Sequence, residues 1–281
     1  MIPISRFKAM LASAVAAACL TSASATLAAD AQMAGGTQPE EPAGYLKPGE
    51  LPDSVALLPP PPALGSAAEA LDQDIAREML KLRGSERFRL AGLDADLDFP
   101  EAAGTFSCAL GAAVTERDTP TLYRILRRVK ADAGAATGAS KNKYRHARPF
   151  MLDGEPTCVK SEDEEELRKN GSYPSGHTSI GWAWAEVLAE IAPDRADAIL
   201  ERGRAFGESR LVCNVHWASD VREGRMIATA TVARLHASPE FLADAQAAKL
   251  EVEAARKKGL RPQRDCRFEA EALKEKHGWT P

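Results

Sequence analysis

Apolar side chains recur every three or four positions across residues 65–257, and this periodicity restricts the fold to packed helices. One example is "TPTLYRILRRVKADAGAAT" (119–137), which begins with a Thr-Pro pair typical of a helix N-terminus. Its apolar residues fall on one face: Leu122, Ile125, Leu126 and Val129. The alternation of Val, Ile and aromatic residues that marks strands is almost absent. The sequence therefore predicts an all-α protein, a single multi-helix bundle.

The same periodicity locates the other helices. A long helical stretch follows Ser66, a candidate N-cap. Its apolar positions are Ala70, Leu71, Ile75, Met79, Leu80 and Leu82. Further helices are expected over 177–191, 194–212, 217–237 and 239–257. The chain is predicted to divide into a signal peptide (1–29), an extended Pro-rich lead-in (30–64), a helical domain (65–240) and a charged helical tail (241–281).

The first 29 residues have the parts of a secretory signal. Arg6 and Lys8 precede an apolar run, and small residues follow it. Candidate cleavage positions follow Ala25, Ala28 and Ala29. Lipidation at Cys19 is the alternative, on a poor lipoprotein motif. We expect the mature chain to be periplasmic or secreted.

Charge and hydropathy exclude two kinds of partner. The formal net charge is −4, and removal of the two basic residues Arg6 and Lys8 takes it to −6, which gives no general attraction to nucleic acid or anionic membrane. The longest later apolar run, 180–192, contains two glutamates and is too short to span a bilayer. The acidic run "SEDEEELRK" (161–169) and the basic stretch "YRILRRVK" (123–130) are interpreted as solvated faces.

Four cysteines remain after the leader, at positions 108, 158, 213 and 266. An even number in an exported chain favours two disulfides, with three possible pairings. No two of these cysteines lie close enough in the sequence to form the usual zinc knuckle.

Three stretches suggest one phosphate site. In "SYPSGHTSIGW" (172–182), Ser175 and Gly176 lead a turn into a helix whose first N–H groups suit an anion, and His177 stands at the junction. A capped helix with an incidental histidine is the alternative. In "KNKYRHARP" (141–149), Lys141 and Arg148 offer fixed cations to phosphate oxygens.

The third stretch is "ESRLVCNVHWASDV" (208–221). His216 and Asp220 are spaced i, i+4, so we expect them one above the other on a helix face. The carboxylate would then take the Nδ1 proton and leave Nε2 as a lone-pair donor. Arg210 is expected to reach the same anion from the preceding turn.

The patterns Lys-x6-Arg-Pro, Pro-Ser-Gly-His and Ser-Arg-x5-His-x3-Asp are complete and in this order. The chain thereby resembles the type 2 phosphatidic-acid-phosphatase and vanadium haloperoxidase superfamily, and within it the secreted class A bacterial non-specific acid phosphatases. The resemblance implies an all-helical bundle, no metal or other cofactor, homo-oligomers, and broad hydrolysis of phosphomonoesters with some phosphotransfer to alcohols. It also implies site roles. Phosphate is held by Lys141, Arg148, Ser175, Gly176 and Arg210, while His177 is the acid/base, His216 the nucleophile and Asp220 its orienting partner.

Several points stay open at the level of sequence. Residues 93–111 differ from the Asn/Ser/Gly-rich loop that family members carry near the mouth of the site, where the leaving group is expected to lie. Vanadate should inhibit as a mimic of the transition state, as should phosphate. The alternatives are a vanadate-dependent haloperoxidase and a catalytically silent phosphate-binding protein. A membrane lipid phosphatase would need spans that are missing after the leader. His146, His236 and His277 are given no role.

The positions of the cysteines in the motifs favour one pairing. Cys158 follows the Arg148-Pro149 loop and Cys213 lies between Arg210 and His216, so a Cys158–Cys213 bond would join two halves of the site. Cys108 and Cys266 then pair by elimination.

Overall fold

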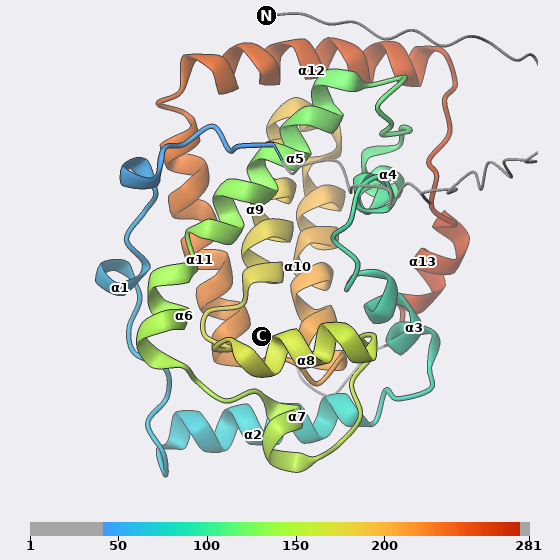
Figure 1. The fold of residues 1–281 in the computed structure, drawn as a ribbon. Helices are drawn as coiled ribbons and strands as arrows, with labels where there is room; N and C mark the ends of the chain where they lie inside the picture. Colours follow the sequence, from blue (N-terminus) through green and yellow to red (C-terminus); the bar gives the residue numbers. More distant parts are fainter. Residues whose placement is uncertain (1–41, 276–281) are drawn as a thin grey trace, which may run out of the picture. The chain divides into compact units, whose positions relative to one another are not determined.

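The computed structural model describes residues 42–275, which form helices, turns and loops and no strand (Figure 1). The predicted all-α bundle is confirmed. The signal peptide lies outside the described residues, as do residues 30–41 and the last six residues of the chain.

Helix α9 (Gly176–Ile191) is the centre of the bundle, packed by α5 (Pro120–Ala135), α10 (Ala196–Val212) and α11 (Ala218–Leu235). It is apolar on nearly all sides, as a helix surrounded by others must be. Trp184 is fully buried there, and its Nε1 donates to the carbonyl of Leu126, 2.8 Å away. The side chains of α5 predicted for the core are all buried. The helix that carries His177 is thus held from three sides.

The long helical stretch expected after Ser66 is two helices, α2 (Ala67–Leu80) and α3 (Glu86–Leu93). Gly84 has a φ of 80°, which ends the run, and Ser85 caps the second helix by accepting from the N–H of Phe88. Ser66 caps α2 as predicted. Leu71 was expected on the apolar face but is 55% exposed, because the buried face of α2 is formed by Asp72, Ile75 and Met79.

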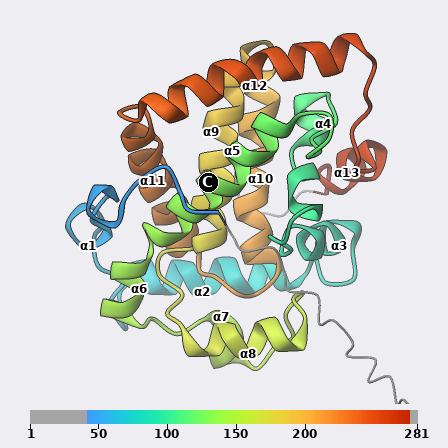
Figure 2. The ribbon, with the colours of Figure 1, turned by 45° about the horizontal axis from the view of Figure 1, so that its top comes forward.

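Helix α12 (Pro239–Lys257) crosses one end of α5, α9 and α10, and α2 lies at the opposite end in both views (Figures 1 and 2). The apolar face of α12 joins the main core through Phe241, Ala248, Val252 and Ala255. Glu251 accepts from the N–H groups of Thr121 and Leu122 and so caps α5. Residues beyond 240 therefore contribute to the same core as the helices before them.

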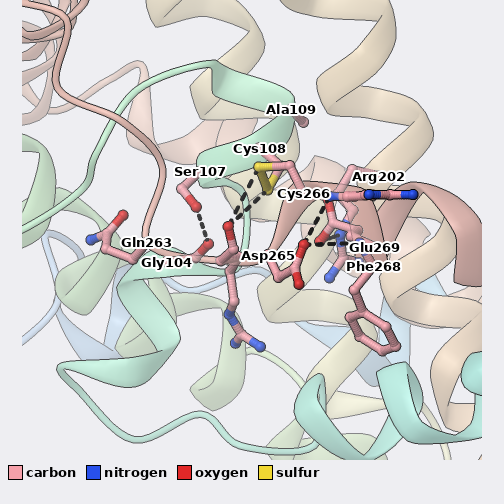
Figure 3. Close-up of a disulfide and its surroundings, with 12 residues drawn as sticks. Gly104, Ser107, Cys108, Ala109, Arg202, Gln263, Asp265, Cys266, Phe268 and Glu269 are labelled. Carbon is pink, nitrogen blue, oxygen red and sulfur yellow. Dashed lines mark hydrogen bonds and ion pairs between the residues drawn. A yellow bond between two sulfur atoms is a disulfide. The ribbon is translucent and has the colours of Figure 1, made fainter.

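The disulfides pair as predicted. Cys108–Cys266 joins α4 (Ser107–Leu110) to α13 (Cys266–Ala272), as Figure 3 shows. Beside it, Nε of Arg202 in α10 lies 3.0 Å from Oε2 of Glu269 in α13. Cys158–Cys213 joins the segment before α8 (Ser161–Lys169) to the end of α10.

The remaining helices are short and lie around the bundle. They are α1 (Ser54–Leu57), α6 (Gly138–Tyr144), α7 (Pro149–Asp153) and α8 (Ser161–Lys169), with 3-10 turns at Pro48–Glu50, Glu101–Gly104 and Pro193–Arg195. None of the helices between residues 42 and 275 is long and apolar enough to cross a membrane.

Candidate active site

The N-terminus of α9 is fixed against the first turn of α11. Oγ of Ser175, the N-cap, accepts from the N–H of Thr178 at 3.2 Å, and the N–H of Ser175 donates to the carbonyl of Asp220 at 2.9 Å. The close approach requires Gly224, because a Cβ there would lie 2.7 Å from the carbonyl oxygen of Ser175. The predicted phosphate turn and the predicted His/Asp pair are therefore one unit.

His216 and Asp220 are in contact, although not on a helix face as expected. His216 precedes Trp217, whose extended backbone is the N-cap of α11, and Asp220 lies in the first turn. Oδ2 of Asp220 accepts from the N–H of Trp217 at 2.9 Å, so this carboxylate caps the helix. The same oxygen lies 3.1 Å from Nδ1 of His216. The aspartate both starts α11 and holds the histidine.

The hydrogen bonds fix the tautomer of His216. Nη1 of Arg148 lies 3.0 Å from Nε2 of His216, and a guanidinium can only donate, so Nε2 carries the lone pair and Nδ1 carries the proton. Burial and the charge of Arg148 lower the pKa of His216 well below its usual value, against the opposing effect of Asp220. The ring is therefore neutral, and its Nε2 lone pair accepts from Arg148.

Asp220 is ionised despite being fully buried. Burial raises its pKa, but the nearby rings of His146 and His216 and the hydrogen bond from the Trp217 N–H outweigh it, so the pKa lies well below the ordinary range. A fixed negative charge at this position stabilises a positive charge developing on His216.

Arg148 is held on every side. Its guanidinium donates to the carbonyls of Leu167 and Val215, both at 2.9 Å, and to Oδ1 of Asn170 at 2.6 Å. Lys141 donates from Nζ to the carbonyl of Gly171 at 2.7 Å. Burial, with the neighbouring charge of Arg148, lowers the pKa of Lys141 to about 7. These two cations are rigidly aimed, and both are destabilised by their burial.

Arg210 is the exception, because its guanidinium is fully buried and almost without partners. Nε and Nη2 make no hydrogen bond, and Nη1 contacts only Sγ of Cys213, at 3.9 Å. Burial and the charge of Arg148 lower its pKa to about 9. A buried donor left unpaired costs about 1–3 kcal/mol, more when charged, so this arrangement suits an anion that completes the hydrogen bonds.

Arg210 and His177 open onto a cavity of about 880 Å³. Nε2 of His177 lies 2.9 Å from the carbonyl oxygen of Ala95, so Nε2 carries a proton and Nδ1 is the second titrating atom. Burial and the charge of Arg210 hold the pKa of His177 well below its usual value. The cavity thus gives a ligand access to a cation and to a proton-carrying ring.

Comparison with known proteins identifies the family to which these site residues belong. The family model of the PAP2 superfamily matches residues 126–242, which include every predicted site residue. The non-specific acid phosphatase of Providencia stuartii is 47% identical over 206 residues, 73% of this chain and 83% of that protein. The chain belongs to the PAP2 superfamily.

Two further relatives support the same membership. The acid phosphatase of Zymomonas mobilis is 40% identical over 204 residues, 73% of this chain and 77% of the relative. The non-specific acid phosphatase of Salmonella typhimurium is 40% identical over 198 residues, 70% of this chain and 79% of the relative.

This PAP2 member has a second histidine beside Asp220 to which the sequence analysis gave no role. Nδ1 of His146 lies 3.1 Å from Oγ of Ser172 and 3.7 Å from Oδ1 of Asp220. Its position in the basic loop, two residues before Arg148, was the only local signal. Oγ of Ser172 donates to Oδ1 of Asp220 at 3.4 Å, so His146 lies beside this oxygen and contacts the serine, whereas His216 contacts Oδ2.

The hydrogen-bond donors that converge in this PAP2 member suit an oxyanion. Within residues 42–275, no three His, Cys, Asp or Glu side chains lie close enough to hold a metal ion. The groups that converge instead are cations and ring nitrogens.

Proposed function

We propose that this chain is a broad-range acid phosphatase that hydrolyses phosphomonoesters through a phosphohistidine on His216. The observation that carries the proposal is Arg210, a buried guanidinium with unpaired Nε and Nη2 at a cavity shared with His177. The names of the relatives, acid phosphatase and non-specific acid phosphatase, support the reaction class.

Binding uses the cations and the start of α9. A phosphoryl group accepts from Arg210, Lys141 and Arg148 and from the free N–H groups of Gly176 and His177 in the first turn. When a phosphate oxygen takes Nη1 of Arg148, Nε2 of His216 is released from its present contact. Binding therefore uncovers the nucleophile.

His216 then attacks phosphorus in line through Nε2, and the bond to the leaving oxygen breaks. Charge on the equatorial oxygens is stabilised by the same cations. The positive charge on the imidazole is stabilised by Asp220, which holds Nδ1–H at 3.1 Å. Water then attacks the phosphohistidine and returns His216 to its neutral form. An alcohol in place of water gives phosphotransfer.

His177 is the proton donor to the leaving oxygen and later the base for water. Its pKa is depressed by burial and by Arg210, so the ring is neutral before substrate binds. A bound phosphate dianion offsets the neighbouring cations and raises that pKa. Protonation of His177 is thus coupled to occupancy of the site.

The remaining parts of the proposal rest on the sequence. The leader favours a periplasmic or secreted enzyme, and the family resemblance favours a homo-oligomer inhibited by phosphate and vanadate. Ser175 acts mainly through its cap on Thr178, which orients the N–H groups of the phosphate turn.

Two variants test the roles of the histidines. His216→Ala removes the attacking atom and should abolish activity on all esters. His177→Ala removes a proton worth about 10²–10⁴ in rate, which matters for alkyl phosphates and little for p-nitrophenyl phosphate. His236→Ala, at a surface ion pair with Glu190, is the control and should retain full activity.

The measurement is single-turnover phosphoryl transfer from p-nitrophenyl phosphate and glycerol 2-phosphate. Equal losses on both substrates in His177→Ala would remove His177 from the acid role. Full activity in His216→Ala would refute the mechanism.

A further inference from the structure

We propose that this phosphatase, among the phosphomonoesters it hydrolyses, prefers those whose leaving group carries a positive charge on an aliphatic arm, such as a quaternary or primary ammonium. The inference rests on the proposed function and names the substrate class of the same site. It comes from the wall of the cavity above Arg210 and His177.

The wall of this cavity is acidic. Six carboxylates line it: Asp96, Asp98, Glu101, Glu116, Asp163 and Glu166. Apart from Arg210 at the phosphate site, only two cations line it, Lys160 and Arg264. One of the carboxylates, Glu166, also pairs with Lys169, with 2.6 Å between Oε1 and Nζ. The side of the site that receives the leaving group is therefore net negative, although the phosphate side is net positive.

Between the carboxylates the wall is apolar. Leu93, Leu97, Val114, Val159 and Leu167 line the cavity together with the ring of Tyr123. Aliphatic and aromatic surface beside negative charge is the combination that binds alkylammonium groups, because methylene and N-methyl groups need apolar contact and the cation needs charge.

The acidic wall and the phosphate site are electrostatically linked. Arg210, fully buried with two unpaired nitrogens, marks where the phosphoryl group is bound. The charge of Asp163 acts on Arg210, opposing the fall in the pKa of the arginine. A substrate with phosphate on Arg210 thus holds its leaving group within the field of Asp163, and a carboxylate on that leaving group is repelled.

Helix α8 supplies a matched pair of variants. Asp163, Glu166, Glu162 and Glu165 are all exposed on this helix, but only Asp163 and Glu166, one turn apart, line the cavity. Asp163→Asn/Glu166→Gln and Glu162→Gln/Glu165→Gln change the net charge of the protein equally. Only the first changes the charge of the cavity.

The probes are phosphocholine, with a cationic leaving group, 3-phosphoglycerate, with an anionic one, and p-nitrophenyl phosphate, with a neutral one. For each, kcat/KM of the variant is divided by that of the wild type, so the intrinsic reactivity of the ester cancels. We expect Asp163→Asn/Glu166→Gln to lower phosphocholine turnover and to raise 3-phosphoglycerate turnover, each about threefold to tenfold, the range for two partly exposed charge pairs. High salt should shrink both changes.

Each outcome has one meaning. Opposite changes for the two charged substrates, with the control double variant unchanged, support the proposal. Equal changes for both, no change, or the same changes in the control overturn it. Turnover of p-nitrophenyl phosphate by the wild type separates this from the proposed function, because an enzyme inactive on all three esters refutes the phosphatase assignment itself.

Discussion

Replacing Arg210 with methionine should raise the stability of the protein in phosphate-free buffer and abolish its activity. The guanidinium is fully buried and leaves Nε and Nη2 without partners. A fall in its pKa from 12.5 to about 9 corresponds to a destabilisation of the charged form by about 5 kcal/mol. At pH 7, below both values, the arginine is charged in the folded and the unfolded chain, so the whole cost is present.

Methionine fills similar volume without a charge to desolvate, and the attraction of Arg210 to Asp94 and Asp163 is already included in the lowered pKa. We therefore expect the free energy of unfolding of Arg210→Met to exceed that of the wild type by about 2–4 kcal/mol in phosphate-free buffer. Inorganic phosphate at about 100 times its Kd should stabilise the wild type by about 2.7 kcal/mol and leave the variant nearly unchanged. The activity should fall by at least about 10³-fold, as when a transition-state donor is lost.

The assay is urea unfolding of the oxidised protein with and without phosphate, followed by circular dichroism. Arg202→Met is the matched control, since Arg202 is as deeply buried in the same helix but is paired with Asp94 and Glu269. Loss of Arg202 leaves the buried carboxylates of Asp94 and Glu269 without their cation and should destabilise the protein by about 3–5 kcal/mol. If Arg210→Met is destabilised as much as Arg202→Met, the guanidinium is a structural group and does not form an anion site.

Three further predictions follow from the site. The value of kcat/KM should fall as pH rises through about 7, because Lys141 with its lowered pKa loses its charge there. Lys141→Arg stays charged, so its kcat/KM should fall less on the alkaline side. Identical pH profiles for the variant and the wild type would exclude Lys141 as the titrating group. Asp220→Asn should lower kcat on the order of 10⁴-fold with little change in KM, because Nδ1–H of His216 loses its anionic acceptor. A change in KM alone would contradict the role of Asp220 as the partner that orients His216. Activity should survive EDTA and be abolished by vanadate, and loss in EDTA that divalent metal restores would contradict the assignment.

The helices and the motif residues could be predicted from the sequence because both depend on local spacing. Leu122, Ile125 and Val129 recur at helical intervals and are all buried. The small residues around Ser175 form the cap that their types suggest. In contrast, the prediction that His216 and Asp220 lie on one helix face was wrong. They are in contact, but His216 precedes α11, because the Asp220 carboxylate caps the start of that helix.

Contacts that depend on tertiary packing could not be predicted. The acidic run 161–169 looked like a solvated face, and α8 indeed has no buried residue, yet Asp163 and Glu166 line the cavity because α8 lies at its mouth. Leu71 fits the apolar pattern of α2 but points away from the core. The role of Glu251 as a cap on α5, 130 residues away in sequence from Thr121, has no local signal at all.

The central claim is that Nε2 of His216 becomes covalently phosphorylated. The direct measurement is rapid quenching of the enzyme in alkali within the first turnover of a ³²P-labelled phosphomonoester, followed by peptide mapping. We expect one label per active site, stable to alkali and labile to acid, on the peptide that contains His216, and no label in His216→Ala. Turnover without a labelled protein, or a label on a different residue, would contradict the account.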